Sequence, residues 1–395
     1  MRKKILSLLL TSIIITTPAT TILTSTNVIA YGANLNEVKA EKSLDLTIYE
    51  NIKKTASLLS TKDKLGEWQV PSMVRLEKIT DIQKQNILND INARIEKKYA
   101  DEYSSQMAKD IIVLTSLNEN PQTYKNFDLI NEMINKKDYI GSCNYEVWIL
   151  LCSTINNYSI SAENKITLNE VISDIIKCQN ENGGFSYTPG GSWIDVDMTG
   201  MAIFALSPYK NKTQEIEDAI NNGKNYILSE LSKNNGKFDN SNTTAMAILG
   251  LSSIGYDCSS LAEDLLTYEL EDGSFTWKKD TPECNDFATE QSLYSLIQYS
   301  AAKDNKNIFD FNDKWTYSEV INNITSSNTN VATNSPSNNS SSTPDDGKNP
   351  SGTTTATNTA SSTPTNDNRS ILLAFSFLIC SSLSIKYLKK RSLND

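Results

Sequence analysis

The sequence of 395 residues predicts an all-α fold, with about six helical hairpins closed into one ring, then a disordered spacer and one C-terminal transmembrane helix. Three observations predict the hairpins. The sequence repeats at about 45 residues, amphipathic segments alternate with wholly apolar ones, and each clear repeat contains a Gly-x-Phe turn. Because each unit can bury its apolar helix only against neighbouring units, the set must stack or close.

The Gly-x-Phe turns mark the repeat. They occur at 183–185, 236–238 and 273–275. Each turn follows a segment that is charged on one side and precedes a segment of small and apolar residues. The three apolar segments span 199–209, 243–253 and 288–299, so they begin 44 and 45 residues apart. Two helices of ~12–15 residues and two loops account for that period.

The apolar segments are expected to be the inner helices, because a helix that is apolar around its whole circumference is buried. Segments beginning at Ala108 and Asn144 are similar in character, and a segment from Glu67 begins the first hairpin. A ring of inner helices within a ring of outer helices buries all six. An open superhelix is the alternative.

The two ends of the chain carry targeting features. Residues 1–30 combine a basic head, an apolar run and small residues before Tyr31, which predicts a cleaved signal peptide. Residues 370–388 are apolar and are followed by a basic tail at 389–395. By the positive-inside rule the tail is cytoplasmic, so everything before the transmembrane helix is expected on the extracellular face of the plasma membrane. Attachment to the cell wall is the alternative to a plain membrane anchor.

The sequence thus divides into six parts. We expect a signal peptide (1–30), an N-terminal linker (31–43), a folded domain (44–321), a spacer rich in Ser, Thr, Asn and Pro (322–369), the transmembrane helix (370–388) and the tail (389–395). The spacer has too little apolar content to offset the entropy of ordering.

Composition excludes several function classes. The net charge is −10, which argues against nucleic acid as a partner. The chain contains no histidine, which removes the commonest metal ligand and the commonest general base, so we expect no metal site. Five cysteines precede the transmembrane segment, and their irregular spacing leaves the disulfide state open.

Several segments resemble a known family. CQNENGGFSY, WIDVDMTGMAIFALSPY, NTTAMAILGLSSIGYD and NDFATEQSLYSLIQY are similar to the prenyltransferase/squalene-oxidase repeat domains of Firmicute surface proteins. Those domains belong to the α/α-toroid superfamily of terpenoid cyclases, protein prenyltransferases and cobalamin carriers. The resemblance covers roughly 44–312. It implies an α/α toroid but not one function, because members of the superfamily perform different chemistry.

The resemblance offers two cofactor or catalytic interpretations. Class II terpene cyclases carry Asp-x-Asp-Asp, and this chain has Asp195, Asp197 and then Met198, so Asp197 is the candidate catalytic acid without its supporting acid. Capping of a helix that begins near Met198 is the structural interpretation of either aspartate. Cobalamin carriers read Val-Asp-Thr where this chain has Val-Asp-Met-Thr, but no β-rich domain follows here. We therefore expect no cofactor, with cobalamin as the alternative.

Parallel inner helices would place their N-termini on one face of the ring. The residues expected to meet a ligand there are Tyr145, Glu146, Trp193, Asp195, Asp197, Asn242, Asp286 and Glu290. Aromatic and carboxylate side chains around a concave mouth are typical of a binding pocket. The sequence favours a non-enzymatic binding module for a small molecule, glycan or protein at the cell surface. The alternative is an extracellular enzyme, either glycan-active or a degenerate cyclase.

Overall fold

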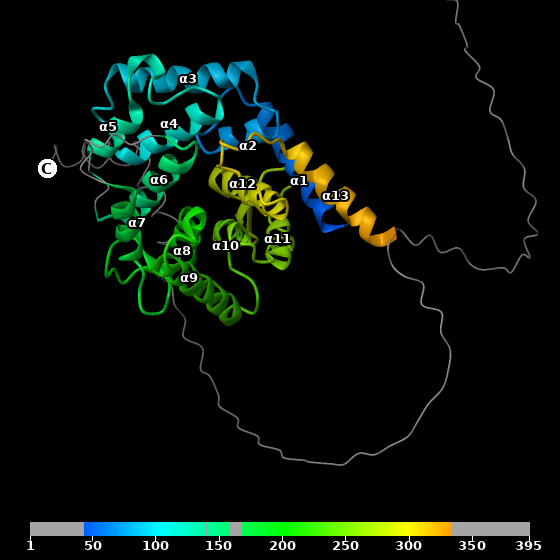
Figure 1. Ribbon diagram of the computed structural model, residues 1–395. Helices are drawn as coiled ribbons and strands as arrows, with labels where there is room; N and C mark the ends of the chain where they lie inside the picture. The colour runs from blue at the N-terminus through cyan, green and yellow to red at the C-terminus, as the bar shows by residue number, and fades with distance from the viewer. Residues whose placement is uncertain (1–42, 137, 139–140, 159–166, 334–395) are drawn as a thin grey trace, which may run out of the picture. The chain divides into compact units, whose positions relative to one another are not determined.

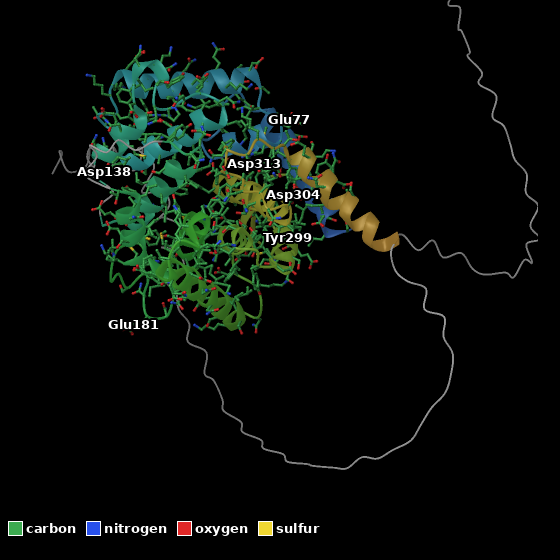
Figure 2. The ribbon with its side chains drawn as sticks, in the orientation of Figure 1. Glu77, Asp138, Glu181, Tyr299, Asp304 and Asp313 are labelled. Carbon is green, nitrogen blue, oxygen red and sulfur yellow. The ribbon has the colours of Figure 1, made fainter. Side chains whose placement is uncertain are left out.

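The computed structural model describes residues 43–136, 138, 141–158 and 167–333. These residues form thirteen α-helices and two small two-stranded sheets, so the fold is all-α as the sequence predicts (Figure 1). Side chains fill the gaps between the helix ribbons (Figure 2). The predicted signal peptide, transmembrane helix and basic tail lie outside the described residues. Within the described part, none of the helices has both the length and the apolar character needed to cross a membrane.

The first twelve helices alternate in character. The even-numbered helices are α2 (Gln69–Arg75), α4 (Ser104–Ser116), α6 (Cys143–Thr154), α8 (Val196–Leu206), α10 (Ser241–Ser253) and α12 (Asp286–Lys303). The odd-numbered helices are α1 (Leu44–Ser60), α3 (Asp81–Glu96), α5 (Leu129–Lys136), α7 (Leu168–Ile176), α9 (Gln214–Lys233) and α11 (Ser259–Leu266). Ten of the eleven residues of α8 are buried, whereas α9 buries only one side. This difference is the predicted alternation of apolar and amphipathic helices.

The even-numbered helices contact one another in a closed cycle. Each contacts the next even-numbered helix along the chain, and α12 contacts α2. The first helix takes part in the closure, because the Thr55 hydroxyl donates a hydrogen bond to the Gly273 carbonyl at 2.8 Å and Lys54 donates to the Leu270 carbonyl at 2.9 Å. The turn between α11 and α12 is therefore fastened to α1.

The Gly-x-Phe turns repeat at the level of individual bonds. The N–H of Phe185 donates to the Thr199 hydroxyl at 2.9 Å, and the N–H of Phe275 donates to the Thr289 hydroxyl at the same distance. Both phenylalanines are fully buried. Gly273 has a φ of 89°, and a side chain there would collide with the backbone of α1, so only glycine fits. At two of the three turns the glycine thus lies against the backbone of another helix, whereas a side chain at Gly236 would meet nothing within 4 Å.

Two short hairpins of β-structure accompany the turns and were not predicted. β1 (Phe185–Ser186) pairs with β2 (Ile194–Asp195), and β3 (Thr276–Lys278) pairs with β4 (Thr281–Cys284). Both are antiparallel. They lead the chain from the Gly-x-Phe turn into the start of the next even-numbered helix, and so they position the residues at its first turn.

The predicted start of the spacer lies inside a helix. α13 (Tyr317–Thr333) runs across residue 322. Val320, Ile321 and Ile324 are buried, and α13 contacts α12. Ile324, at helical spacing from Val320 and Ile321, extends the packed region beyond the boundary at residue 321 that composition alone suggested.

Candidate functional site

Arg75 anchors the segment that closes the space between the even-numbered helices. It lies at the end of α2 and is only 3 % exposed. Its guanidinium donates hydrogen bonds to four backbone carbonyls between residues 308 and 315. The rings of Phe311 and Trp315 flank it at 4.3 and 4.2 Å. Burial lowers its pKa to about 10, so it stays charged at neutral pH.

The anchored segment inserts Phe309 among the even-numbered helices. The centre of its ring lies 5.9 Å from that of Trp68, 5.8 Å from that of Phe204 and 6.0 Å from that of Tyr294. Trp148 packs on Trp68 at 4.3 Å. The cavity left among these rings has a volume of only about 10 Å³. Ligand pockets usually measure ~300–1,000 Å³, so this aromatic cluster is packing and not a substrate chamber.

The first turns of several even-numbered helices meet at one end of the cluster. Gln106 of α4 donates to Glu67 at 3.0 Å, and a side-chain atom at Gly66 would lie 3.1 Å from Glu290 of α12. The Thr243 hydroxyl of α10 donates to Asp197 of α8. We call the region defined by Glu67, Gln106, Asp197, Thr243 and Glu290 the N-terminal face. It includes two of the predicted ligand residues.

Asp195 caps the N-terminus of α8, as expected if one of the two aspartates is a helix cap. Its carboxylate accepts a hydrogen bond from the N–H of Met198 at 2.7 Å, and α8 begins at Val196. Burial raises its pKa to about 6, while bonds from Met198, Tyr187 and Trp193 oppose the rise. Trp193 is 47 % exposed and lies beside this carboxylate. Asp197 does not cap the helix, so the alternative assignment of the cap to Asp197 was wrong.

Asp197 and Glu290 are the two unusual carboxyl groups of the N-terminal face. Both are half-buried. Burial raises the pKa of Asp197 to about 7, with a smaller effect from the charge of Asp195, and burial raises the pKa of Glu290 to about 8. Both charges act on the buried hydroxyl of Tyr294. Both side chains therefore keep some exposed surface although their carboxyl groups lose hydration. At neutral pH each is partly protonated.

Other predicted residues do not join this pair. Glu146 is buried, accepts from the Gly141 N–H at 3.1 Å and lies near Asp174 of α7, so it faces away from the N-terminal face. Burial raises its pKa to about 7. Asp286 is exposed and pairs with Lys62 at 3.2 Å, at the rim. Among the other candidates, Tyr145 packs against Tyr103 at 6.2 Å, and Asn242 accepts from the Ser241 hydroxyl at 3.3 Å.

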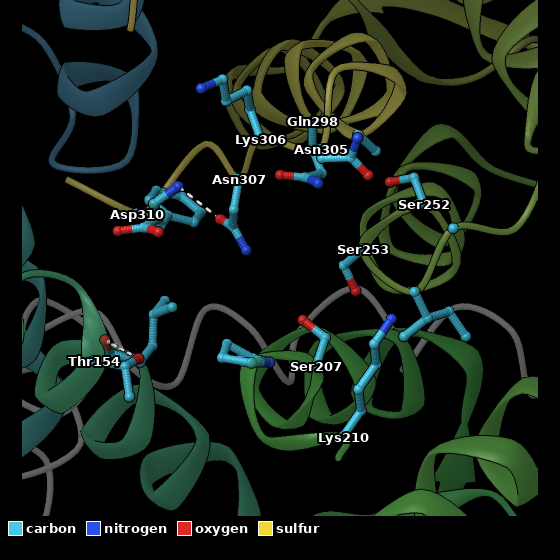
Figure 3. A pocket seen from close by; sticks show the side chains of 16 residues that line it. Thr154, Ser207, Lys210, Ser252, Ser253, Gln298, Asn305, Lys306, Asn307 and Asp310 are labelled. Carbon is cyan, nitrogen blue, oxygen red and sulfur yellow. Dashed lines mark hydrogen bonds between the residues drawn. The ribbon is translucent and has the colours of Figure 1, made fainter. Parts of the chain in front are cut away.

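A larger hollow lies at the opposite ends of α6, α8, α10 and α12 and was not predicted (Figure 3). Its volume is about 340 Å³, within the range of ligand pockets. Its polar lining includes Thr154, Ser207, Lys210, Ser253, Gln298 and Asn307. The Ser, Lys and Asn residues that follow the apolar segments were the only sequence signal for it, and they look like ordinary helix ends.

Within the described residues, no group of three or more Cys, Asp or Glu side chains is placed to hold a metal ion. No protein-family model matches the chain, and no curated protein matches it. The function must therefore be argued from the geometry.

Proposed function

We propose that this chain is a cell-surface-anchored α/α toroid that acts as a non-enzymatic binding module, with its ligand at the N-terminal face. The closed cycle of contacts among the even-numbered helices supports the toroid. The observation that carries the binding function is the aromatic cluster around Phe309, which leaves about 10 Å³ between the helices. A ring filled in this way offers a ligand its surface and leaves no chamber for a cyclisation reaction.

The chemistry of the N-terminal face favours a ligand with a protonated amine. Asp197 and Glu290 are poorly hydrated, so a positive charge placed between them would stabilise their ionised forms. Trp193, near the rim, supplies exposed aromatic surface, on which a cationic group also binds well. Amines occur in small molecules, amino sugars and proteins, so the three ligand classes expected from the sequence remain.

The location of the module follows from the ends of the sequence. The signal peptide at 1–30, the transmembrane segment at 370–388 and the basic tail would hold the folded domain outside the cell. Deleting residues 370–395 should release the protein into the medium. Continued retention of the shortened chain on cells would contradict this anchor.

An extracellular enzyme is the second candidate, and one observation favours it. Asp197 and Glu290 have pKa values of about 7 and 8, and a general acid works best when its pKa lies near the working pH. A glycan-active enzyme would use both carboxyl groups of the N-terminal face. A cyclase is disfavoured because the space beneath them is filled.

A binding titration separates the two candidates. Spermidine, cobalamin and a wall disaccharide would be titrated into the purified full chain at pH ~8, and each probe would be recovered and checked for chemical change. The binding module is supported if the parent binds spermidine and the double variant Asp197→Asn, Glu290→Gln does not. Asp81→Asn is the matched control, because Asp81 is an exposed carboxylate in the first turn of α3, outside the N-terminal face. If the parent converts a probe chemically and the double variant does not, the enzyme is established instead. If none of the probes binds, the proposed site is rejected.

A further inference from the structure

We propose that the ends of the even-numbered helices opposite the N-terminal face form a second binding site, which takes an acidic oligosaccharide. The site joins the hollow of Figure 3 to a neighbouring hollow along α9. We call the two together the C-terminal groove. It lies beyond the site of the proposed function, and its ligand is of a different chemical class.

The groove is continuous and elongated. Each hollow measures about 340 Å³, and the two share Lys210, Ile254 and Gly255. The first lies between the ends of α6, α8, α10 and α12, and the second extends to Glu217 and Lys224 of α9. Two connected hollows suit a chain of linked units better than one compact molecule.

The hydroxyl groups that line the groove are available as hydrogen-bond acceptors. Thr154, Ser207 and Ser253 donate their own hydrogens to backbone carbonyls of Leu151, Phe204 and Gly250 at 3.0, 2.8 and 2.7 Å. Their oxygen lone pairs therefore remain free to accept. Sugar hydroxyls can donate to such oxygens.

The amide groups of the groove have the complementary role. The side-chain oxygen of Gln298 accepts from the Ile308 N–H at 2.9 Å, and that of Asn307 accepts from the Phe309 N–H at 2.9 Å. Their NH₂ groups are left as donors. A lining that offers both hydrogen-bond acceptors and donors suits a sugar, because each sugar hydroxyl can donate and accept a hydrogen bond.

Lys210 and Tyr256 narrow the ligand class further. Lys210 is exposed at the junction of the two hollows and forms no ion pair with a described residue. Lys224 and Lys306 also line the hollows, together with the carboxylates of Asp310 and Glu217, but Lys210 is the lysine common to both hollows. In a chain with a net charge of −10, an ammonium group at this junction favours a carboxylate. Tyr256, 39 % exposed at the outer end, offers an apolar ring face with a polar tip. Sugar rings carrying a carboxylate fit this combination.

The test compares three tetrasaccharides by calorimetry on the full chain: hyaluronan (carboxylated, host type), N-acetylglucosamine–N-acetylmuramic acid (carboxylated, wall type) and neutral chitotetraose. Lys210→Ala should weaken binding of the carboxylated oligosaccharides about tenfold and leave chitotetraose unchanged. Tyr256→Ala should weaken all three. Lys212→Ala is the matched control, since Lys212 lines neither hollow.

The pattern of affinities then identifies the source of the ligand. Preference for hyaluronan indicates a host glycan, and preference for the muramic acid polymer indicates the cell's own wall. The Asp197→Asn, Glu290→Gln variant should bind as the parent does, which separates this site from the N-terminal face. Three results would overturn the proposal. Both carboxylated probes could fail to bind below ~1 mM, Lys210→Ala and Lys212→Ala could have equal effects, or a tetraglutamate peptide could bind equally well.

A separate observation concerns two buried thiols. Cys143, the first residue of α6, and Cys178, two residues past the end of α7, are both 0 % exposed free thiols, and the Cys178 thiol donates to the Asp174 carbonyl at 3.4 Å. The N–H of Cys143 donates to the Tyr187 carbonyl at 2.9 Å, and the N–H of Ser186 donates to the Cys178 carbonyl at 3.0 Å. Strand β1 and the residue after it thus hold both cysteines.

We infer that Cys143 and Cys178 form a disulfide in the exported protein. This inference rests on the extracellular location within the proposed function, because disulfides persist in oxidising compartments. The two thiols lose two protons and two electrons, and the disulfide of an exported thiol oxidoreductase accepts them and becomes two thiols. The bond would form as the hairpin of α6 and α7 folds, before burial seals it.

Two measurements test the bond and the location separately. Unfolded full-length chain refolded with glutathione and its disulfide should yield a Cys143–Cys178 peptide on non-reducing mapping and an intact mass lower by two hydrogens. Cys143→Ser should leave Cys178 open to alkylation after denaturation, whereas Cys152→Ser should not, because Cys152 takes no part in the proposed bond. Free thiols at both positions after refolding would reject the pair. If the disulfide forms on refolding in vitro but is missing in protein isolated from cells, only the exported location is rejected.

Discussion

Replacing Gly200 by alanine tests the close packing of α8 on α10. The added methyl group would lie 2.2 Å from the backbone oxygen of Met246 and 2.8 Å from its carbonyl carbon. Ordinary contact begins at 3.4 Å, so the two helices would have to separate by about 1.2 Å (3.4 − 2.2). Gly250 makes the reciprocal approach to Gly200 from α10. Because the obstacle is backbone, no side-chain rotation can relieve it.

Two opposing effects set the change in unfolding free energy. Alanine gains about 1 kcal/mol over glycine in helix propensity. Overpacking a close-packed core costs about 1–3 kcal/mol, and the upper end applies here because α10 is itself packed against α12. We expect Gly200→Ala to lower the free energy of unfolding by about 2 kcal/mol.

Urea denaturation of the full chain measures this change, and Gly223→Ala is the matched control. Gly223 also lies inside a helix, but its methyl group would meet side chains and not backbone, with Ile203 at 3.2 Å and Phe185 at 3.4 Å. We expect this control to be neutral or up to about 1 kcal/mol more stable than the parent. Equal stability of the two variants would refute the close approach of α8 and α10.

Three further predictions concern the N-terminal face and the core. Asp195→Ala should cost about 1 kcal/mol in thermal unfolding, because the cap on Met198 is lost, whereas Asp197→Asn should lose no cap. The folded pKa values of Asp197 and Glu290 lie above their unfolded values of 3.8 and 4.5, so their contribution to stability is complete below pH 3.8 and is lost as the pH rises through about 7 and 8. Stability curves from pH ~4 to ~9 should therefore be flatter in the Asp197→Asn, Glu290→Gln variant, and an unchanged slope would contradict the raised pKa values. Ala247→Leu should overpack the fully buried side of α10 and cost about 1–3 kcal/mol in urea denaturation, and a neutral effect would show that the site has room.

The repeat could be predicted because its causes are local. Each Gly-x-Phe turn needs glycine for its backbone conformation, and each wholly apolar segment can only be a buried helix. The predicted inner helices 243–253 and 288–299 lie within α10 and α12, and 199–209 covers most of α8 and the turn after it. The helix starts were displaced by two or three residues, since Asp195, Asn240 and Asn285 cap further upstream than the apolar pattern suggested.

The aromatic cluster and the C-terminal groove could not be predicted, because their residues come from distant parts of the chain. Phe309 reaches the even-numbered helices only because Arg75, more than 230 residues earlier, binds the backbone around it. Sequence periodicity reports on one helix at a time and carries no signal for such a contact. The groove has the same origin, since the ends of four helices and the loop after α12 all contribute residues to it.

The predicted carboxylates face different sides of their helices because they occupy different positions in the helical turn. Counting from the first residue of each helix, Asp197 is second in α8, Glu290 is fifth in α12 and Glu146 is fourth in α6. At 3.6 residues per turn, each position rotates by about 100°, so the second and fifth positions share a side, and the fourth points well away from both. Lys109, sixth in α4, lies close in phase to the second position, and its charge does act on Glu290. Once the cap positions are known, the position of each polar residue in its helix determines which side of the helix it faces. An error of two residues in a helix start is enough to assign the wrong carboxylate to the site.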